Sequence, residues 1–126
     1  MAITQLQIGQ KTISFVPQCD YSNKTVISAP FTQQTRDNKS FFIATINTTE
    51  DCYLSFQGQQ TDSENQFYIV DTTNTDDNSV LLSVHLDKEH ISWDYYMQPI
   101  FVKRGKTIEF RVRGFVNVKI WKWGLI

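Results

Sequence analysis

Hydrophobic and polar residues alternate along much of the chain, most clearly in the stretch 98–123. Near its middle, Ile108, Phe110 and Val112 are separated by single polar or charged residues, among them Glu109 and Arg111. A period of two places one face of a β-strand in a core and the other in water. The pattern therefore predicts three successive strands separated by turns: Ile100–Val102, Thr107–Arg113 and Phe115–Trp123.

Shorter alternating or β-branched runs, bounded by Gly, Pro, Asn and Asp, recur over the rest of the chain. Glycine and glutamine at 9–10 suit a tight hairpin turn between the first two runs. The polar segments 17–23, 58–65 and 71–78 are predicted to be loops. The remaining predicted strands are Ile3–Ile8, Lys11–Val16, Lys24–Ser28, Phe31–Thr35, Ser40–Asn47, Cys52–Gln57, Gln66–Val70, Ser79–Leu86 and Ile91–Met97.

About ten short strands with turn signals every 8–12 residues or so are typical of a sandwich or barrel. No long window shows the 3.6-residue period of an amphipathic helix. The chain has 126 residues, of which 40% are hydrophobic, which is enough for one core. The sequence therefore predicts an all-β fold over residues 1–126, a single antiparallel β-sandwich of jelly-roll or immunoglobulin-like type.

The net charge, the N-terminal segment and the lengths of the apolar runs limit which kinds of partner we expect. The formal net charge is −1 and the pI is near 6.1, which argues against a nucleic-acid partner. The cations of the last quarter are predicted to form a solvated strand face. The beginning of the chain lacks the basic and apolar regions of a signal peptide, and no apolar run approaches the ~20 residues of a membrane span. We therefore expect a soluble protein made in a cytoplasm, without a membrane partner.

The two cysteines differ in their surroundings. Cys52 begins an alternating run and is predicted to be a small core residue. Cys19 lies in the predicted loop 17–23 and is expected to be exposed. A disulfide between them would need an oxidising compartment, and the sequence leaves that pairing open.

No motif in the sequence carries catalytic chemistry. His85 and His90 have no cysteine or third histidine at ligand spacing, and they are predicted to be surface residues. A pair of carboxylates such as Asp94 and Glu109 would need to face each other across a cleft. No nucleophile elbow or phosphate-binding glycine loop is present, so we expect no enzymatic activity and no catalytic residue. An enzyme with a site made by the loops 58–65 and 71–78 is the weakest of the hypotheses.

One polar loop offers oxygen ligands. Asp71, Asn74, Asp76 and Asp77 could together contact a calcium ion, which prefers six to eight oxygens or so. The loop lacks the glycine and terminal glutamate of an EF-hand, and the same residue types cap ordinary turns. The sequence therefore predicts no obligatory metal or other cofactor, with calcium as a weak candidate.

Aromatic residues are the best indication of function. Trp93, Tyr95 and Tyr96 fall on one predicted strand, and Trp121 and Trp123 lie near the end of another, on the face opposite the predicted core. Exposed Trp and Tyr side chains anchor protein partners or stack on sugar rings. They are alternatively buried under a loop or another chain. We predict that these five residues form a ligand-binding or partner-binding face.

Two resemblances add to this interpretation. The segment VKRGKTIEFRVRG resembles the closing strands of small jelly-roll modules. A small chain rich in Thr, Asn and Gln, with many short strands, resembles the accessory virion proteins of tailed bacteriophages. The resemblance implies a structural protein of the virion, made in the host cytoplasm, that decorates the capsid or belongs to a fibre or the tail. By this resemblance its partners would be other protein subunits, including further copies of the chain in a homo-oligomer. The alternative is a carbohydrate-binding module that recognises a glycan, for example at a cell surface.

Overall fold

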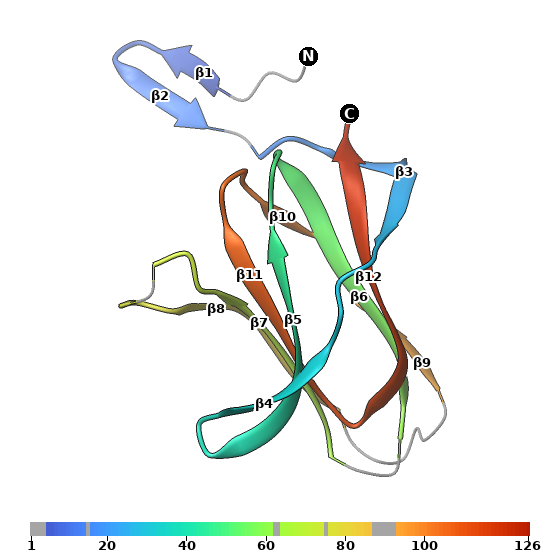
Figure 1. Ribbon diagram of the computed structural model, residues 1–126. Helices are drawn as coiled ribbons and strands as arrows, with labels where there is room; N and C mark the ends of the chain where they lie inside the picture. The colour runs from blue at the N-terminus through green and yellow to red at the C-terminus, as the bar shows by residue number, and fades with distance from the viewer. Residues whose placement is uncertain (1–4, 15, 62–63, 75, 87–92) are drawn as a thin grey trace.

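A computed structural model describes residues 5–14, 16–61, 64–74, 76–86 and 93–126. These residues form strands and turns (Figure 1). No helix among them could cross a membrane. The strands are β1 Gln5–Ile8, β2 Lys11–Ser14, β3 Cys19–Ile27, β4 Thr32–Arg36, β5 Lys39–Asn47, β6 Cys52–Gln60, β7 Asn65–Asp71, β8 Ser79–Leu86, β9 Asp94–Tyr96, β10 Ile100–Val102, β11 Thr107–Arg113 and β12 Phe115–Leu125.

Two five-stranded antiparallel sheets make up the body of the protein (Figure 1). The first sheet has the order β10-β6-β12-β3, with β9 pairing further along the same edge of β6. The second sheet has the order β4-β5-β11-β7-β8. Strands β1 and β2 form a separate hairpin. The predicted all-β, antiparallel sandwich is therefore confirmed.

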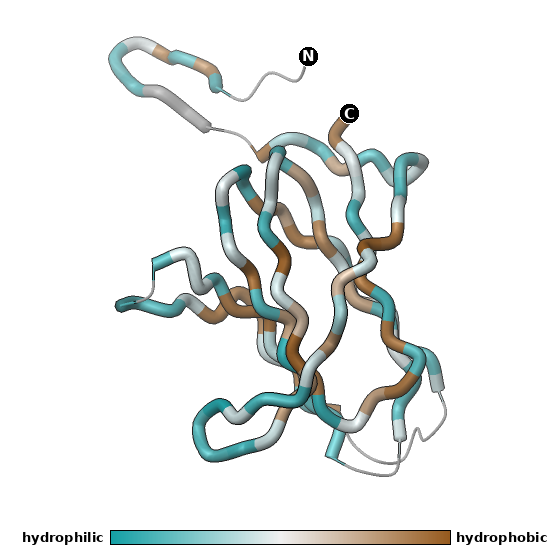
Figure 2. The backbone as a smooth tube through the Cα atoms, viewed as in Figure 1, coloured by the Kyte–Doolittle hydropathy of each residue, from teal (hydrophilic) through white to brown (hydrophobic). Residues whose placement is uncertain are grey.

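The core lies between the two sheets and follows the predicted alternation. Ile108, Phe110 and Val112 of β11 are all buried. At the centre, the ring of Phe56 from the first sheet stacks on Phe67 from the second, with centroids 4.7 Å apart. Burying one large apolar side chain contributes about 1.5–3 kcal/mol relative to leaving it exposed. Figure 2 shows the corresponding alternation of hydrophobic and hydrophilic residues along the strands.

A single residue carries the chain from one sheet to the other. β11 belongs to the second sheet and β12 to the first, and only Gly114 separates them. Gly114 has a φ of 76°, a conformation that glycine adopts without steric cost. Its carbonyl accepts hydrogen bonds from the backbone N–H and the hydroxyl of Thr61, both at 3.0 Å. The predicted turn at Gly114 is therefore present, and it joins two layers.

The N-terminal hairpin extends away from the sandwich (Figure 1). Gly9, at the predicted turn, has a φ of 61°. Register is regular, with Leu6 opposite Ile13 and Ile8 opposite Lys11. Leu6 and Ile8 are both exposed. The predicted hairpin is confirmed over β1 and β2, while residues 3–4 and 15 lie outside the described part of the chain.

Two predicted loops are partly strand. β3 begins at Cys19, within the predicted loop 17–23, because it pairs with the end of β12, where Cys19 lies opposite Leu125. Cys19 is consequently buried, so the prediction that it is exposed was wrong. Cys52 is buried as predicted, and both cysteines are free thiols. β6 likewise continues to Gln60, because the start of β12 and β9 pair with it.

Candidate functional site

The outer face of the first sheet carries a ladder of hydrogen bonds between β12 and β6. The indole N–H of Trp121 donates to Oε1 of Gln57 at 2.9 Å, and that of Trp123 donates to Oγ of Ser55 at 2.8 Å. Trp121 lies directly opposite Ser55 in the register, so its indole reaches the diagonal neighbour. Both indole donors are thus satisfied within the sheet, and the orientation of the rings is fixed.

Strand β3 adds a cation and a third ring to this face. Lys24 lies opposite Trp123 in the register. Its Nζ is 4.3 Å from the ring centroid of Trp121 and 5.2 Å from that of Trp123, both within cation–π range. The ring of Tyr21 meets Trp123 edge to face, with centroids 5.6 Å apart. Three strands of the sheet therefore contribute to one aromatic and cationic cluster.

A shallow pocket of about 240 Å³ opens over this cluster. The segment 96–99, which leads from β9 to β10, closes one side of it and contributes Tyr96. Tyr21 and Tyr96 are each 65% exposed, whereas Trp121 and Trp123 are half-buried. We call Tyr21, Lys24, Tyr96, Trp121 and Trp123 the aromatic face. It presents aromatic rings, two phenol groups and the ammonium group of Lys24, and Nζ of Lys119 lies 5.8 Å from the ring centroid of Trp121.

The structure separates the five predicted site residues. Tyr96, Trp121 and Trp123 lie together on the aromatic face. Tyr95 instead packs on the core, with its ring centroid 5.4 Å from that of Phe67, and this burial raises the pKa of its hydroxyl. Trp93 is exposed, and its carbonyl accepts a hydrogen bond from the backbone N–H of Gln60.

Sequence reasoning missed two members of the aromatic face. Tyr21 and Lys24 come from β3, and the first of them falls in the segment predicted to be a loop. Asp20, Ser22, Asn23 and Lys24 are all polar, so no apolar alternation there predicts a strand. The nearby proline, aspartate and asparagine residues instead favour a loop.

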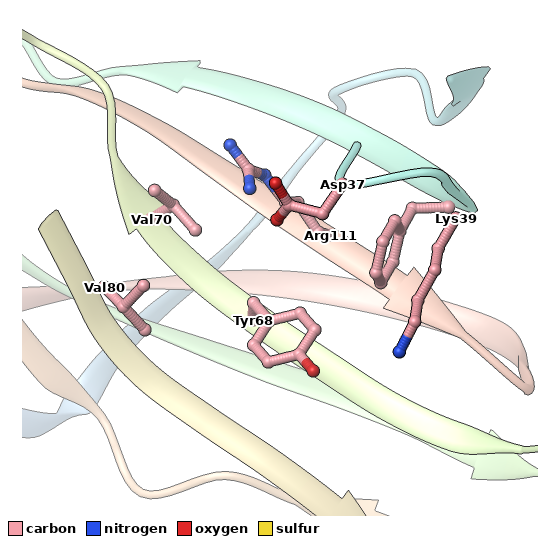
Figure 3. A pocket seen from close by; sticks show the side chains of 7 residues that line it. Asp37, Lys39, Tyr68, Val70, Val80 and Arg111 are labelled. Atoms are coloured by element: carbon pink, nitrogen blue, oxygen red, sulfur yellow. The ribbon is translucent and has the colours of Figure 1, made fainter. Parts of the chain in front are cut away.

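A second pocket, of about 220 Å³, lies on the outer face of the second sheet (Figure 3). Its lining combines aromatic, aliphatic and charged side chains: Asp37, Lys39, Phe41, Tyr68, Val70, Val80 and Arg111. Figure 3 shows the Arg111 guanidinium and the Asp37 carboxylate on one side of the pocket and Tyr68 on the other. This face was predicted to be solvated, yet the side chains of Arg111 and Glu109 are only 11% and 13% exposed.

Ion pairs explain why charged residues are tolerated there. Glu109 accepts hydrogen bonds from Nε of Arg111 at 2.9 Å and from Nη2 of Arg36 at 3.3 Å. Burial raises the pKa of the Glu109 carboxyl, but the two guanidinium groups more than offset this, and the pKa lies below its usual value. Glu109 is therefore a structural anion.

The candidate catalytic residues do not converge. Glu109 lies on β11 of the second sheet, whereas Asp94 belongs to β9 of the first. His85 is exposed on β8, and its Nε2 is 4.0 Å from a carboxylate oxygen of Glu64. His90 lies outside the described residues. The structure therefore does not bring Asp94 and Glu109 together as a facing pair, and it places His85 beside the Glu64 carboxylate.

The candidate calcium loop is held by its own hydrogen bonds. The Asp71 carboxylate accepts bonds from the backbone N–H and hydroxyl of Thr73, at 2.9 and 2.5 Å. It also lies 3.7 Å from the ammonium group of Lys106. Asn74 accepts bonds from the backbone N–H groups of Asp76, through its side chain, and of Asp77, through its carbonyl. Within the described residues, no group of three or more metal-ligating side chains forms.

Comparison with known proteins provides no further assignment. The chain matches no family model, no curated protein and no solved structure, so the proposal of a function rests on the geometry of the aromatic face.

Proposed function

We propose that this protein is a non-enzymatic interaction module, and that the aromatic face is its contact surface for a partner protein. The observation that carries the proposal is the hydrogen bonding of the two indoles. Because Gln57 and Ser55 satisfy both N–H groups, the rings of Trp121 and Trp123 offer rigid apolar surface without a polar group left to pair. Rigid aromatic anchors of this kind dominate the energy of many protein interfaces.

The chemistry of the pocket favours contact over catalysis. Among the described residues, its lining contains no carboxylate, histidine or cysteine, which are common acid–base and nucleophilic groups in enzyme sites. The cation in its described lining is Lys24, held over the two indoles. The matching partner segment would place an apolar or proline-rich stretch on the exposed rings of Tyr21 and Tyr96 and a carboxylate beside Lys24.

The resemblance to phage accessory proteins extends this proposal to an assembly. In that setting the protein would be a capsid-decorating, fibre or tail-associated subunit of a virion, would be made in the host cytoplasm, and would be present as a homo-oligomer beside other subunits. Other exposed apolar side chains, among them Val80 and Val116, are compatible with more than one contact.

A glycan is the alternative ligand. The exposed ring of Tyr96 and the amide of Gln98 border the same pocket and could stack on a sugar and bond its hydroxyl groups. However, Lys24 lies over the face of Trp121, where a sugar ring would stack. This contact makes the protein partner our first proposal.

The test compares two variants of exposed residues. The products of the genes that flank the gene for this protein are co-expressed with the wild type, with Tyr21→Ala/Tyr96→Ala and with the control Phe42→Ala. The proposal expects a flanking product to co-purify with the wild type and the control, and to be lost with the double variant.

Tryptophan fluorescence separates the alternative. The wild type is titrated with glucose, galactose, mannose and N-acetylglucosamine oligomers. A saturable change that the double variant abolishes would establish the glycan in place of the protein partner. The absence of both a complex and a glycan response would reject both functions for this face.

A further inference from the structure

Within the described residues, strand β8 is an edge of the second sheet that lacks proline and the charged residue types Asp, Glu, Lys and Arg. It has eight residues, SVLLSVHL, with no proline, aspartate, glutamate, lysine or arginine. The other edge strands in the described part of the two sheets are either charged or very short. β3 contains Asp20 and Lys24, β4 ends at Arg36, β9 begins at Asp94 and β10 has three residues. Natural proteins normally guard long edges with charge, proline or brevity, because an open ladder pairs with other strands.

The described part of the monomer leaves much of the apolar surface of β8 exposed to solvent. Val80 and Leu81 are 61% and 42% exposed. Leu82, Val84 and Leu86, which point toward the core, are only half-buried. The neighbouring strand β7 buries Phe67, Ile69 and Val70 almost completely. β8 lies at the margin of the molecule in Figure 1, where the first sheet leaves it partly uncovered.

The regular part of the edge is symmetric about its centre. A register shift opposite Ile69 and Val70 leaves Leu81 without a partner in the ladder, so regular pairing covers 82–86. The sequence there is Leu-Ser-Val-His-Leu, whose apolar and polar positions read the same in both directions. Antiparallel pairing about a two-fold axis at Val84 would bring Leu82 opposite Leu86 of a second copy. Ser83 would then face the copy's His85 on the other side of the sheet.

We infer that β8 is a self-association edge. β8 of a second copy of this chain would pair antiparallel with it, so that the β4-β5-β11-β7-β8 sheets of the two copies form one continuous sheet. Two-fold pairing places each residue near the axis opposite itself or its near neighbour, so a charged strand would repel its copy. β8 contains no aspartate, glutamate, lysine or arginine. Apolar side chains would instead meet across the axis and cover the half-buried inner face.

This inference rests on the proposed function only for the premise that the protein assembles, and it uses a different surface. Tyr21 and Tyr96 belong to the first sheet, whereas β8 is an edge of the second. The Tyr21→Ala/Tyr96→Ala variant should therefore keep the two-fold dimer. Loss of the dimer in that variant alone would assign self-association to the aromatic face and overturn the inference.

Sedimentation equilibrium of the full chain tests the edge. We expect the wild type to reach a discrete dimer of twice the 14.7 kDa chain mass as concentration rises. Ser83→Lys/His85→Lys changes two exposed side chains that would face each other across the axis. The introduced ammonium groups should raise the dissociation constant by at least about tenfold. Gln33→Lys/Thr35→Lys, at exposed positions on the opposite edge strand β4, is the matched control and should dimerise like the wild type.

Three results would overturn the inference. The first is a wild type that stays monomeric at its highest soluble concentration. The second is equal dimerisation of the β8 variant and the wild type. The third is open-ended growth of the wild type in place of one closed size, because two-fold pairing closes at two copies. Circular dichroism and thermal melting of each variant establish that the fold is intact, so that a change in mass reports on the edge.

Discussion

Replacing Gly114 by alanine tests how the two sheets are joined. The residue combines a positive φ with close packing. A Cβ there would overlap the carbonyl oxygen of Glu64, and it would lie 2.7 Å from the carbonyl carbon and 2.9 Å from Oδ1 of Asn65. The first two atoms belong to the backbone, so rotation of a side chain cannot relieve the overlap. Gly105 provides a natural control, because its φ is 81° but no atom lies within 4 Å of where its Cβ would be.

The two substitutions differ in one physical contribution. Each places an L-residue in the left-handed region, which costs about 1–2 kcal/mol. Gly114→Ala adds overpacking against a backbone, typically about 1–3 kcal/mol. The expected loss in free energy of unfolding is therefore about 2–5 kcal/mol for Gly114→Ala and about 1–2 kcal/mol for Gly105→Ala.

Urea denaturation followed by tryptophan fluorescence measures both losses. Thermal melting provides a second reading, since each kcal/mol lowers the Tm of a chain of this size by roughly 3–5 °C. Because Gly114 leads directly into β12, the variant should also loosen the ladder that holds Trp121 and Trp123. Equal losses for the two variants would refute the reasoning, since the contact with Glu64 would then contribute nothing.

Three further predictions concern the core and its ionisable groups. Phe56→Ala should lower the free energy of unfolding, measured by urea denaturation, by about 3–5 kcal/mol, because it leaves a cavity beside Phe67. The control Phe42→Ala, at an exposed position, should change the free energy of unfolding by about 0.5 kcal/mol or less. Because the pKa of Glu109 is lower in the folded than in the unfolded chain, its carboxylate stabilises the fold above a pH of about 4.3, and this contribution is lost as the pH falls through the folded-state pKa. The free energy of unfolding of Glu109→Gln should therefore be lower than that of the wild type by about 2 kcal/mol near pH 7, and it should fall less steeply as the pH is lowered. Parallel plots of the free energy of unfolding against pH for the variant and the wild type would contradict the ion-pair account. Burial raises the pKa of the Cys19 and Cys52 thiols. Neither thiol should therefore react with a disulfide reagent near neutral pH until urea unfolds the protein. A rapid reaction of Cys19 in the native state would contradict its burial.

Local pattern was sufficient to predict most strands and the inward-facing side chains. Ile108, Phe110 and Val112 alternate strictly, and that period alone determines which face of β11 is buried. Asp and Asn are residue types that tolerate the positive φ of tight hairpin turns, and Asp37 and Asn38 both adopt it in the turn between β4 and β5. These features depend on neighbours a few residues away in the chain.

Features set by distant segments could not be predicted. Cys19 and Tyr21 lie in a strand because the end of β12, about a hundred residues later, pairs with them. Arg111 is largely buried because Glu109 and the surrounding strands enclose it, which no local period encodes. For the same reason the aromatic face was predicted only in part. Trp121 and Trp123 have the spacing of one strand face, whereas Tyr21 and Lys24 join them through the topology.

The central position of β12 has a consequence for how the protein is made. This strand follows all the others in the chain, yet it lies in the first sheet between β6 and β3. While a ribosome is still synthesising the preceding segments, β3 and β6 have no neighbour to bridge them, and the inner face of that layer is open. Completion of the first layer must therefore wait until Phe115–Leu125 has been synthesised and has left the ribosome. A nascent chain stalled before Phe115 would expose its half-built layer to chaperones and proteases.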